Sequence, residues 1–171
     1  MNLFEKIQSR LSEYIIEPVT LNNLTRYEPV FYTNVEYYTI TEGHSATEQD
    51  CVETVEYMND FPPDTCYSIG FSKEDQAVAF LSLFEGDPEP ETVYIGLFLI
   101  NTPFQRKAIG TTIMETIIDE SFRLGYHALK LSVQSNNISG YSFWQKMGFK
   151  VVAETQCDGF INYSMELTSD I

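Results

Sequence analysis

The stretch that most constrains the fold runs from Val93 to Phe122. Residues 93–100 are almost all apolar, which is typical of a strand buried on both faces of a sheet. A short turn with Pro103 follows, and apolar residues then recur at helical spacing from Ile109 to Phe122. Gly125 is placed to end that helix. A buried strand, a tight turn and a helix in direct succession predict a mixed α/β arrangement.

The start of this helix has the properties of an anion site. Residues 105–111 would present free backbone N–H groups at the positive end of the helix dipole. Gly110 has no side chain to hold a phosphate away from the main chain, and Arg106 and Lys107 add positive charge. The spacing matches neither the P-loop nor the Rossmann fingerprint. An ordinary helix start with two solvated basic residues is the alternative interpretation.

The rest of the chain shows helical patterns first and strand patterns later. A further helix is expected after Asn137 or Ser139, ending at Gly148. The order predicts an α+β or mixed α/β sheet with helices packed on it, and 171 residues fit a single domain, 1–171. Other helices are expected over 3–14, near 21–33 and over 46–60, and strands over 15–19, 66–71, 77–84, 129–134, 149–154 and 161–167.

Composition narrows the class of partner. The net charge is −15, which argues against nucleic acid and suits a cationic substrate, although acidic surfaces also simply keep proteins soluble. No apolar run is long enough to span a membrane, and the first ten residues lack a secretory signal, so we expect a cytoplasmic protein. Cys51, Cys66 and Cys157 share no short spacing, so neither a disulfide framework nor a metal site is expected.

Two motifs taken together resemble those of the GNAT N-acetyltransferase superfamily. Gln105-x-x-Ala108-x-Gly110 after a buried strand is similar to its acetyl-CoA pyrophosphate loop, which is Arg or Gln, two residues, Gly, one residue, then Gly or Ala. About thirty residues on, 137–149 (NISGYSFWQKMGF) is similar to its second signature, Asn-x-x-Ala-x-x-x-Tyr-x-x-x-Gly-Phe. The resemblance covers about residues 66–167. It implies a twisted, mostly antiparallel sheet with a splay between two central parallel strands and helices on both faces.

The resemblance also implies where acetyl-CoA would bind. Main-chain groups of the buried strand would hydrogen-bond pantetheine, and the amides of 105–111 would hold the pyrophosphate. The acetyl thioester would lie in the splay, facing a primary amine of a small cationic molecule or a peptide. The cofactor residues implied in this way are Phe98, Leu99, Ile100, Gln105, Arg106, Lys107, Ala108, Ile109, Gly110, Thr111, Asn137 and Trp144.

Three positions depart from the family pattern. Gly140 replaces an alanine, which weakens the helix. Ala108 replaces the usual first glycine, at a cost of about 1–2 kcal/mol if its φ is positive. Trp144 replaces a tyrosine that often protonates the departing thiolate, and an indole cannot do so. Tyr141 and Tyr163 are therefore candidates for that acid, with a buried structural tyrosine as the alternative interpretation of each.

The reaction also needs a neutral amine, and hence a group that accepts a proton. Glu85 and Glu91, on either side of the turn between two strands, are candidates for this base near the splay. The alternative for each is a solvated loop carboxylate.

Three hypotheses follow. The first is an active N-acetyltransferase, for which we also allow a homodimer. The second is an acyl-CoA-binding regulatory module without turnover. The third, a nucleotide-phosphate binder, is disfavoured by the missing motifs.

Overall fold

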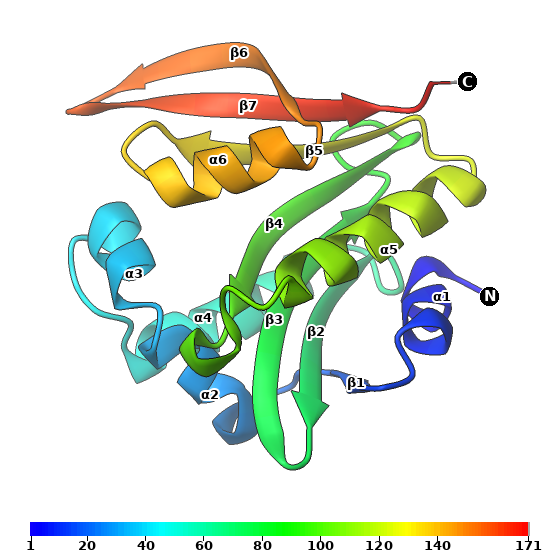
Figure 1. The fold of residues 1–171 in the computed structure, drawn as a ribbon, viewed down its shortest axis with the longest axis vertical. Coiled ribbons are helices and arrows are strands. Elements are labelled where there is room, and N and C mark those ends of the chain that lie inside the picture. Colours follow the sequence, from blue (N-terminus) through cyan, green and yellow to red (C-terminus); the bar gives the residue numbers. More distant parts are fainter. Residues whose placement is uncertain (171) are drawn as a thin grey trace.

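The computed structural model describes residues 1–170 and shows one seven-stranded sheet in the order β1-β2-β3-β4-β5-β7-β6 (Figure 1). Every neighbouring pair is antiparallel except β4 and β5. The expected mixed, mostly antiparallel sheet is therefore confirmed. The strands are β1 (Ile15–Pro18), β2 (Cys66–Lys73), β3 (Gln76–Glu85), β4 (Thr92–Ile100), β5 (Ala128–Gln134), β6 (Lys150–Cys157) and β7 (Phe160–Thr168).

Helices cover both faces of this sheet, and each face has its own hydrophobic cluster. Figure 1 shows α5 crossing in front of the sheet and α4 lying behind it. Strand β3 contributes to both clusters, because successive side chains point to opposite faces: Leu81 and Leu83 pack with α1 and α5, and Phe80 packs with α2 and α4. The helices are α1 (Leu3–Arg10), α2 (Leu24–Tyr32), α3 (Val35–Glu42), α4 (Glu48–Glu56), α5 (Ile109–Arg123) and α6 (Ile138–Lys146), with short 3₁₀ turns η1 (Tyr57–Asp60) and η2 (Thr102–Phe104).

A β-bulge opens the sheet between its two parallel strands. The pairing of β4 with β5 ends at Ile95 and Leu131. On the other side of β4, Leu83 of β3 pairs with Ile95 and Ser82 pairs with Leu97, so Gly96 is an extra residue that bends the strand. Beyond this point β4 and β5 diverge (Figure 1). The splay that the sequence implied is confirmed, and Gly96 marks where it begins.

The bulge also explains one wrong prediction about burial. The run 93–100 was expected to be buried on both faces, but Gly96 is exposed and Leu97 and Phe98 are half-buried. The reason is that the strand loses its β5 neighbour after Ile95. A Cβ atom on Gly96 would lie 2.8 Å from the Phe84 ring, so only glycine fits this bulge without displacing that ring.

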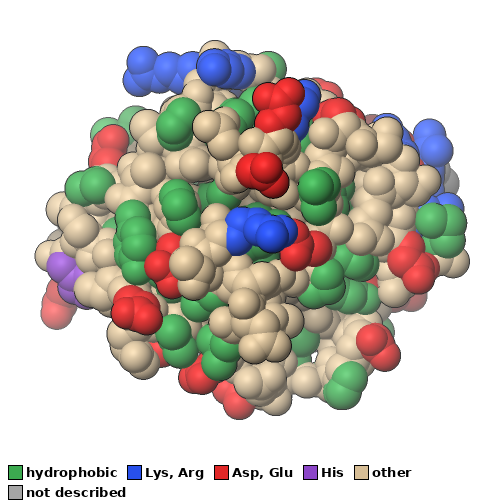
Figure 2. Space-filling view, turned by 90° about the horizontal axis from the view of Figure 1, so that it is seen from below, with side chains coloured by type: hydrophobic (Ala, Val, Ile, Leu, Met, Phe, Trp, Pro, Cys, Tyr) green, Lys and Arg blue, Asp and Glu red, His purple; other side chains and the backbone are tan. Residues whose placement is uncertain are grey.

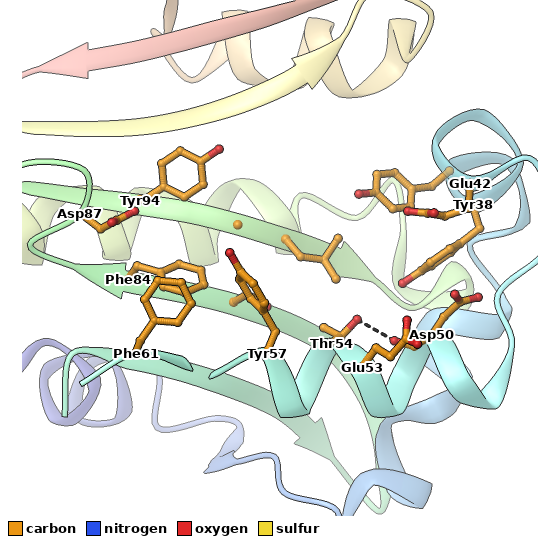
Figure 3. A pocket seen from close by; sticks show the side chains of 14 residues that line it. Tyr38, Glu42, Asp50, Glu53, Thr54, Tyr57, Phe61, Phe84, Asp87 and Tyr94 are labelled. Atoms are coloured by element: carbon orange, nitrogen blue, oxygen red, sulfur yellow. Dashed lines mark hydrogen bonds between the residues drawn. The ribbon is translucent and has the colours of Figure 1, made fainter. Parts of the chain in front are cut away.

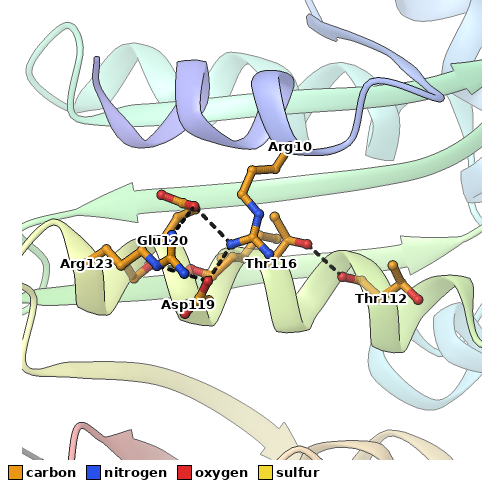
Figure 4. Close-up of polar contacts among 8 residues, drawn as sticks. Arg10, Thr112, Thr116, Asp119, Glu120 and Arg123 are labelled. Atoms are coloured by element: carbon orange, nitrogen blue, oxygen red, sulfur yellow. Dashed lines mark hydrogen bonds and ion pairs between the residues drawn. The ribbon is translucent and has the colours of Figure 1, made fainter.

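An ion-pair network fixes α1 on α5. The Glu120 side chain is 3% exposed, and its Oε1 lies 2.9 Å from Nη1 of Arg10 (Figure 4). The same guanidinium pairs with Asp119, which Arg123 also contacts at 3.2 Å. The helix predicted over 3–14 is shorter than expected and ends at Arg10, the residue that makes this contact. None of the helices in the described residues is long and apolar enough to cross a membrane.

Candidate active site

The start of α5 is a helix N-terminus with free amides. Ala108 is its N-cap, and no side chain caps it. The first hydrogen bond within the helix runs from the Thr112 N–H to the Ala108 carbonyl at 3.0 Å, which leaves the N–H groups of Ile109, Gly110 and Thr111 without helical acceptors. These three free groups and the helix dipole are the features from which the sequence predicted an anion site here.

The loop before α5 has an unusual backbone. Arg106 has φ 61° and Ala108 has φ 62°, both in the left-handed region. Turns that pass through this region can aim successive N–H groups at one anion. The position of the missing family glycine therefore does require a positive φ, and Ala108 carries the strain that the sequence allowed for.

The side chains of the loop divide into anchors and free charges. Gln105 Nε2 donates to the carbonyl of Ile100 at 2.9 Å and to Oδ1 of Asn34 at 3.1 Å, so this amide ties the loop to β4 and to the start of α3. Arg106 and Lys107 are exposed. Because Ile100 O also accepts from Asn34 Nδ2 at 2.9 Å, that carbonyl is already used within the chain.

The splay is walled by aromatic rings from β4 and α6. Phe98 lies 6.2 Å from the Phe143 ring and 6.3 Å from the Trp144 ring. Trp144 is 9% exposed and also packs against Phe149 at 5.3 Å. The geometry thus favours the core interpretation of Trp144, since an indole so placed supports the wall behind Phe98. Leu99 is buried on the opposite face, in the cluster of α2 and α4.

Asn137 caps α6, and this explains Gly140. The Asn137 side chain accepts a hydrogen bond from the Gly140 N–H at 3.1 Å. A Cβ on Gly140 would lie 2.5 Å from Nδ2 of Asn137, so an alanine here would push the amide aside. The departure from the family pattern at Gly140 therefore follows from the way Asn137 folds over the helix start.

Tyr141 and Tyr163 are brought together near the end of β5. Their ring centroids are 5.1 Å apart, and the Tyr141 hydroxyl accepts from Gln145 Nε2 at 3.1 Å. Tyr163 pairs with Val133, beyond the last residue of β5 that pairs with β4. Both tyrosines are half-buried and stand on the β5 side of the splay.

A cavity of about 440 Å³ opens on the face of α3 and α4, beside the bulge. Tyr94, Gly96 and Leu97 of β4 line it, so it meets the splay at the point where β4 leaves β5. The Tyr94 hydroxyl lies 3.1 Å from Oγ of Ser132 on β5, bridging the two strands. Figure 3 shows the side chains converging on this space. The remaining lining residues are Tyr37, Tyr38, Glu42, Asp50, Glu53, Thr54, Tyr57, Phe61, Ser82, Phe84 and Asp87.

The cavity is acidic and aromatic. Four carboxylates line it, and no Lys, Arg or His among the described residues does so. Burial, together with the charge of Glu42, raises the pKa of Tyr37 to about 12, and burial raises the pKa of Tyr38 above its usual range. Both hydroxyls therefore stay protonated at neutral pH. Acidic side chains are also spread over the face in Figure 2, where the basic ones stand apart as separate spots.

The predicted position of Glu85 and Glu91 beside the splay is wrong. Glu85 pairs with Val93, at the end of β4 that remains joined to β5. Its side chain points to the face opposite the cavity, where both carboxylate oxygens accept hydrogen bonds of 2.8 Å from Tyr67 and Tyr126. Glu91 is exposed just before β4, 3.9 Å from His127. The sequence showed their place along the chain but could not show which end of the strand pair would open.

Sequence reasoning also missed the residues that line the cavity. Tyr94 lies inside the apolar run, and its hydroxyl alone did not indicate that this half-buried side chain would line a cavity. Glu42 belongs to α3, a helix that the Asn-, Thr- and Tyr-rich region 21–45 did not reveal. Asp87 lies in the loop after β3, and its neighbours along the chain did not indicate that it would line the same cavity as residues of β4.

The model of the acetyltransferase (GNAT) family matches residues 30–149. The chain therefore belongs to this family and is an enzyme. A comparison with curated proteins finds no match.

Solved structures show the same fold at low identity. An acetyltransferase from Thermus thermophilus is 19% identical with a TM-score of 0.71, over 91% of this chain and 97% of that one. The PaiA N-acetyltransferase from Thermoplasma acidophilum, in complex with coenzyme A, is 15% identical with a TM-score of 0.65, over 91% and 99%. The ribosomal-protein-S18-alanine N-acetyltransferase from Escherichia coli is 14% identical with a TM-score of 0.65, over 92% and 95%.

Proposed function

We propose that this enzyme transfers the acetyl group of acetyl-CoA to a primary amine, carried by a small cationic molecule or a peptide. One observation carries the proposal. The bulge at Gly96 joins two sites: the splay, which leads to the uncapped start of α5, and the acidic cavity on the other face. A thioester in the splay and an amine in the cavity would meet there.

The donor side follows from the free amides and the broken strand pairing. The N–H groups at the start of α5, with Arg106 and Lys107 beside them, would hold the pyrophosphate. Beyond Ile95, the edge of β4 that faces the splay has no strand partner, so main-chain groups around Phe98 would bind pantetheine amides. Asn137, at the start of α6, is proposed to contact the cofactor from the far wall.

The acceptor side must remove a proton before bond formation. A primary alkylammonium has a pKa of about 10.4 and carries no lone pair to attack with. We assign the proton acceptor to Asp87, half-buried at the Tyr94 end of the cavity, acting directly or through a water molecule. The amine nitrogen then bonds to the thioester carbonyl carbon, the C–S bond breaks, and the nitrogen gives up its second proton to solvent as the amide forms. The thiolate leaves as such or takes a proton from a nearby hydroxyl.

Tyrosine hydroxyls around the splay are proposed as that proton source. Tyr94 is favoured because its hydroxyl spans β4 and β5 where they separate. Tyr141 and Tyr163 on the β5 side are the alternatives. Because a thiol has a pKa of about 8.5, its thiolate is a fair leaving group, and losing one donor should slow the reaction rather than stop it.

Two measurements test the proposal in sequence. Calorimetry with CoA should show binding, and no binding at millimolar ligand would overturn the donor site. An assay of free CoA release against a panel of amines should then show turnover. Binding without release from any amine would instead favour an acyl-CoA-binding module.

The role of Asp87 has its own variant. Asp87→Asn should lower the rate by about 10²-fold or more, as expected for loss of a general base, and leave CoA affinity unchanged. Asp75→Asn in the exposed β2–β3 turn is the matched control, and it should leave the rate as it is. Equal rates for both variants would remove Asp87 from the mechanism.

A further inference from the structure

The charges of the cavity lie at two separate ends. Glu42 of α3 and Asp50 and Glu53 of α4 stand at one end, and Asp87 stands at the other, beside Tyr94 (Figure 3). An acceptor with one charge needs only one of these ends. The arrangement therefore suits a molecule that carries positive charge at two positions.

We call the end with Glu42, Asp50 and Glu53 the far end, and its carboxylates have few partners within the protein. Asp50 caps α4 through the Thr47 N–H at 2.8 Å and faces His44 at 3.8 Å. Glu53 accepts only from the neutral amide of Gln49, at 2.9 Å. Within residues 1–170, neither Glu42 nor Glu53 forms an ion pair. Glu42 and Glu53 place two negative charges at the edge of one cavity, and their mutual repulsion is unfavourable unless a ligand supplies a cation.

A tyrosine hydroxyl points into the same end of the cavity. Tyr38 is 5% exposed, and its ring packs against Tyr37 at 5.2 Å and Phe31 at 6.3 Å. Figure 3 shows its hydroxyl directed into the cavity, where it has no hydrogen-bond partner within the described part of the chain. Because the buried ring holds this hydroxyl in place, it is positioned to form a hydrogen bond with a polar ligand in the cavity.

The space between the two ends is lined by rings. Phe61 and Phe84 lie 4.9 Å apart, and Tyr57 packs on both, at 5.1 Å from Phe61 and 6.2 Å from Phe84. Such a wall suits methylene groups through apolar contact, and a ring face also attracts a cation.

We infer that the acceptor is a linear aliphatic diamine or polyamine, a conclusion that rests on the proposed function. Its reacting nitrogen lies by Gly96 and Asp87, its methylene chain lies along the aromatic wall, and its distal ammonium lies between Glu42 and Glu53, within reach of the Tyr38 hydroxyl. The two nitrogens have opposite requirements. The reacting one must lose its proton, whereas the distal one must keep it, so the carboxylates that bind the second are well separated from the site of reaction.

The test compares diamines with monoamines of the same length. CoA release is measured for diaminobutane against butylamine and for diaminopentane against pentylamine, at low and high salt. At low salt we expect kcat/KM to favour each diamine by about tenfold or more, because each exposed carboxylate contributes up to about fivefold. The preference should shrink at high salt, because these carboxylates are exposed to solvent.

Variants test whether the carboxylates of the far end cause the preference for diamines. In Glu42→Gln/Glu53→Gln, the diamine-to-monoamine ratio of kcat/KM should fall by about tenfold. In Glu56→Gln, which removes a carboxylate from α4 outside the cavity, the ratio should equal that of the wild type. CoA affinity, measured by calorimetry, checks that the double variant is folded.

Each outcome decides between the two proposals. Equal kcat/KM for diamines and monoamines, or an unchanged ratio in the folded double variant, would overturn the inference and leave the acetyltransferase proposal standing. No CoA release with any amine, by a protein that binds CoA, would overturn the proposed function itself.

Discussion

Replacing Ala108 by glycine should stabilise the protein, which is the reverse of the usual effect of this substitution. Ala108 has φ 62° and ψ 12°, and its side chain is exposed. A residue with a Cβ in the left-handed region carries about 1–2 kcal/mol of strain, which glycine removes. The methyl group makes no buried contact, so no packing is lost.

The opposing contribution comes from the unfolded chain. Glycine loses more conformational freedom on folding than alanine, at a cost of about 0.5–1 kcal/mol. The net gain in the free energy of unfolding is then about 0.5–1 kcal/mol. For a chain of this length that corresponds to a rise in Tm of about 1–4 °C.

The assay is thermal unfolding with a matched control. Ala153→Gly changes the same residue type at an exposed site on β6, where φ is not positive, and it should lower stability by about 0.5–1 kcal/mol. Opposite signs for the two variants would establish the backbone strain at residue 108. A Tm that falls equally in both would refute the left-handed conformation and, with it, the geometry of the loop that is proposed to bind the pyrophosphate.

Three further predictions concern charges and hydroxyls. Arg106→Ala and Lys107→Ala should each weaken CoA binding by about 2–5-fold in calorimetry at low salt, because exposed charges near an anion contribute little; a salt-independent Kd would contradict this. Arg10→Ala removes a cation from the buried Glu120 carboxylate and should lower the free energy of unfolding in urea by about 1–2 kcal/mol. The expected loss is smaller than for a fully buried ion pair because the Arg10 side chain is 40% exposed. An unchanged urea midpoint would count against the network. Burial, and to a smaller extent the hydrogen bond to Glu85, raises the pKa of Tyr126 to about 12, above the value of about 10 in an unfolded chain. Its contribution to stability is therefore present below pH 10 and lost as pH rises towards 12, and Tyr126→Phe should show a shallower loss in alkaline unfolding curves.

The elements that could be predicted from the sequence are those with a strong local pattern. The last strand was expected over 161–167 and is found at Phe160–Thr168, because apolar and polar residues alternate along it. Helix α5 and the glycine after it follow from the same kind of evidence, since both the apolar stripe and the turn residue lie close together in the chain. In contrast, α3 has a single buried residue, Tyr38, and so shows no apolar stripe.

The start of α5 and the acidic cavity also differ in how far they could be predicted from the sequence. The uncapped start of α5, which is proposed to bind the pyrophosphate, could be located from the sequence, because the residues that mark it, a glycine and two basic residues among them, are neighbours in the chain. The cavity could not, because Glu42, Glu53, Asp87 and Tyr94 come from separate elements and only the folded sheet brings them together. The strand pairing that opens at Gly96 joins the two sites, and it depends on contacts of β4 with β3 and β5 that no local pattern encodes.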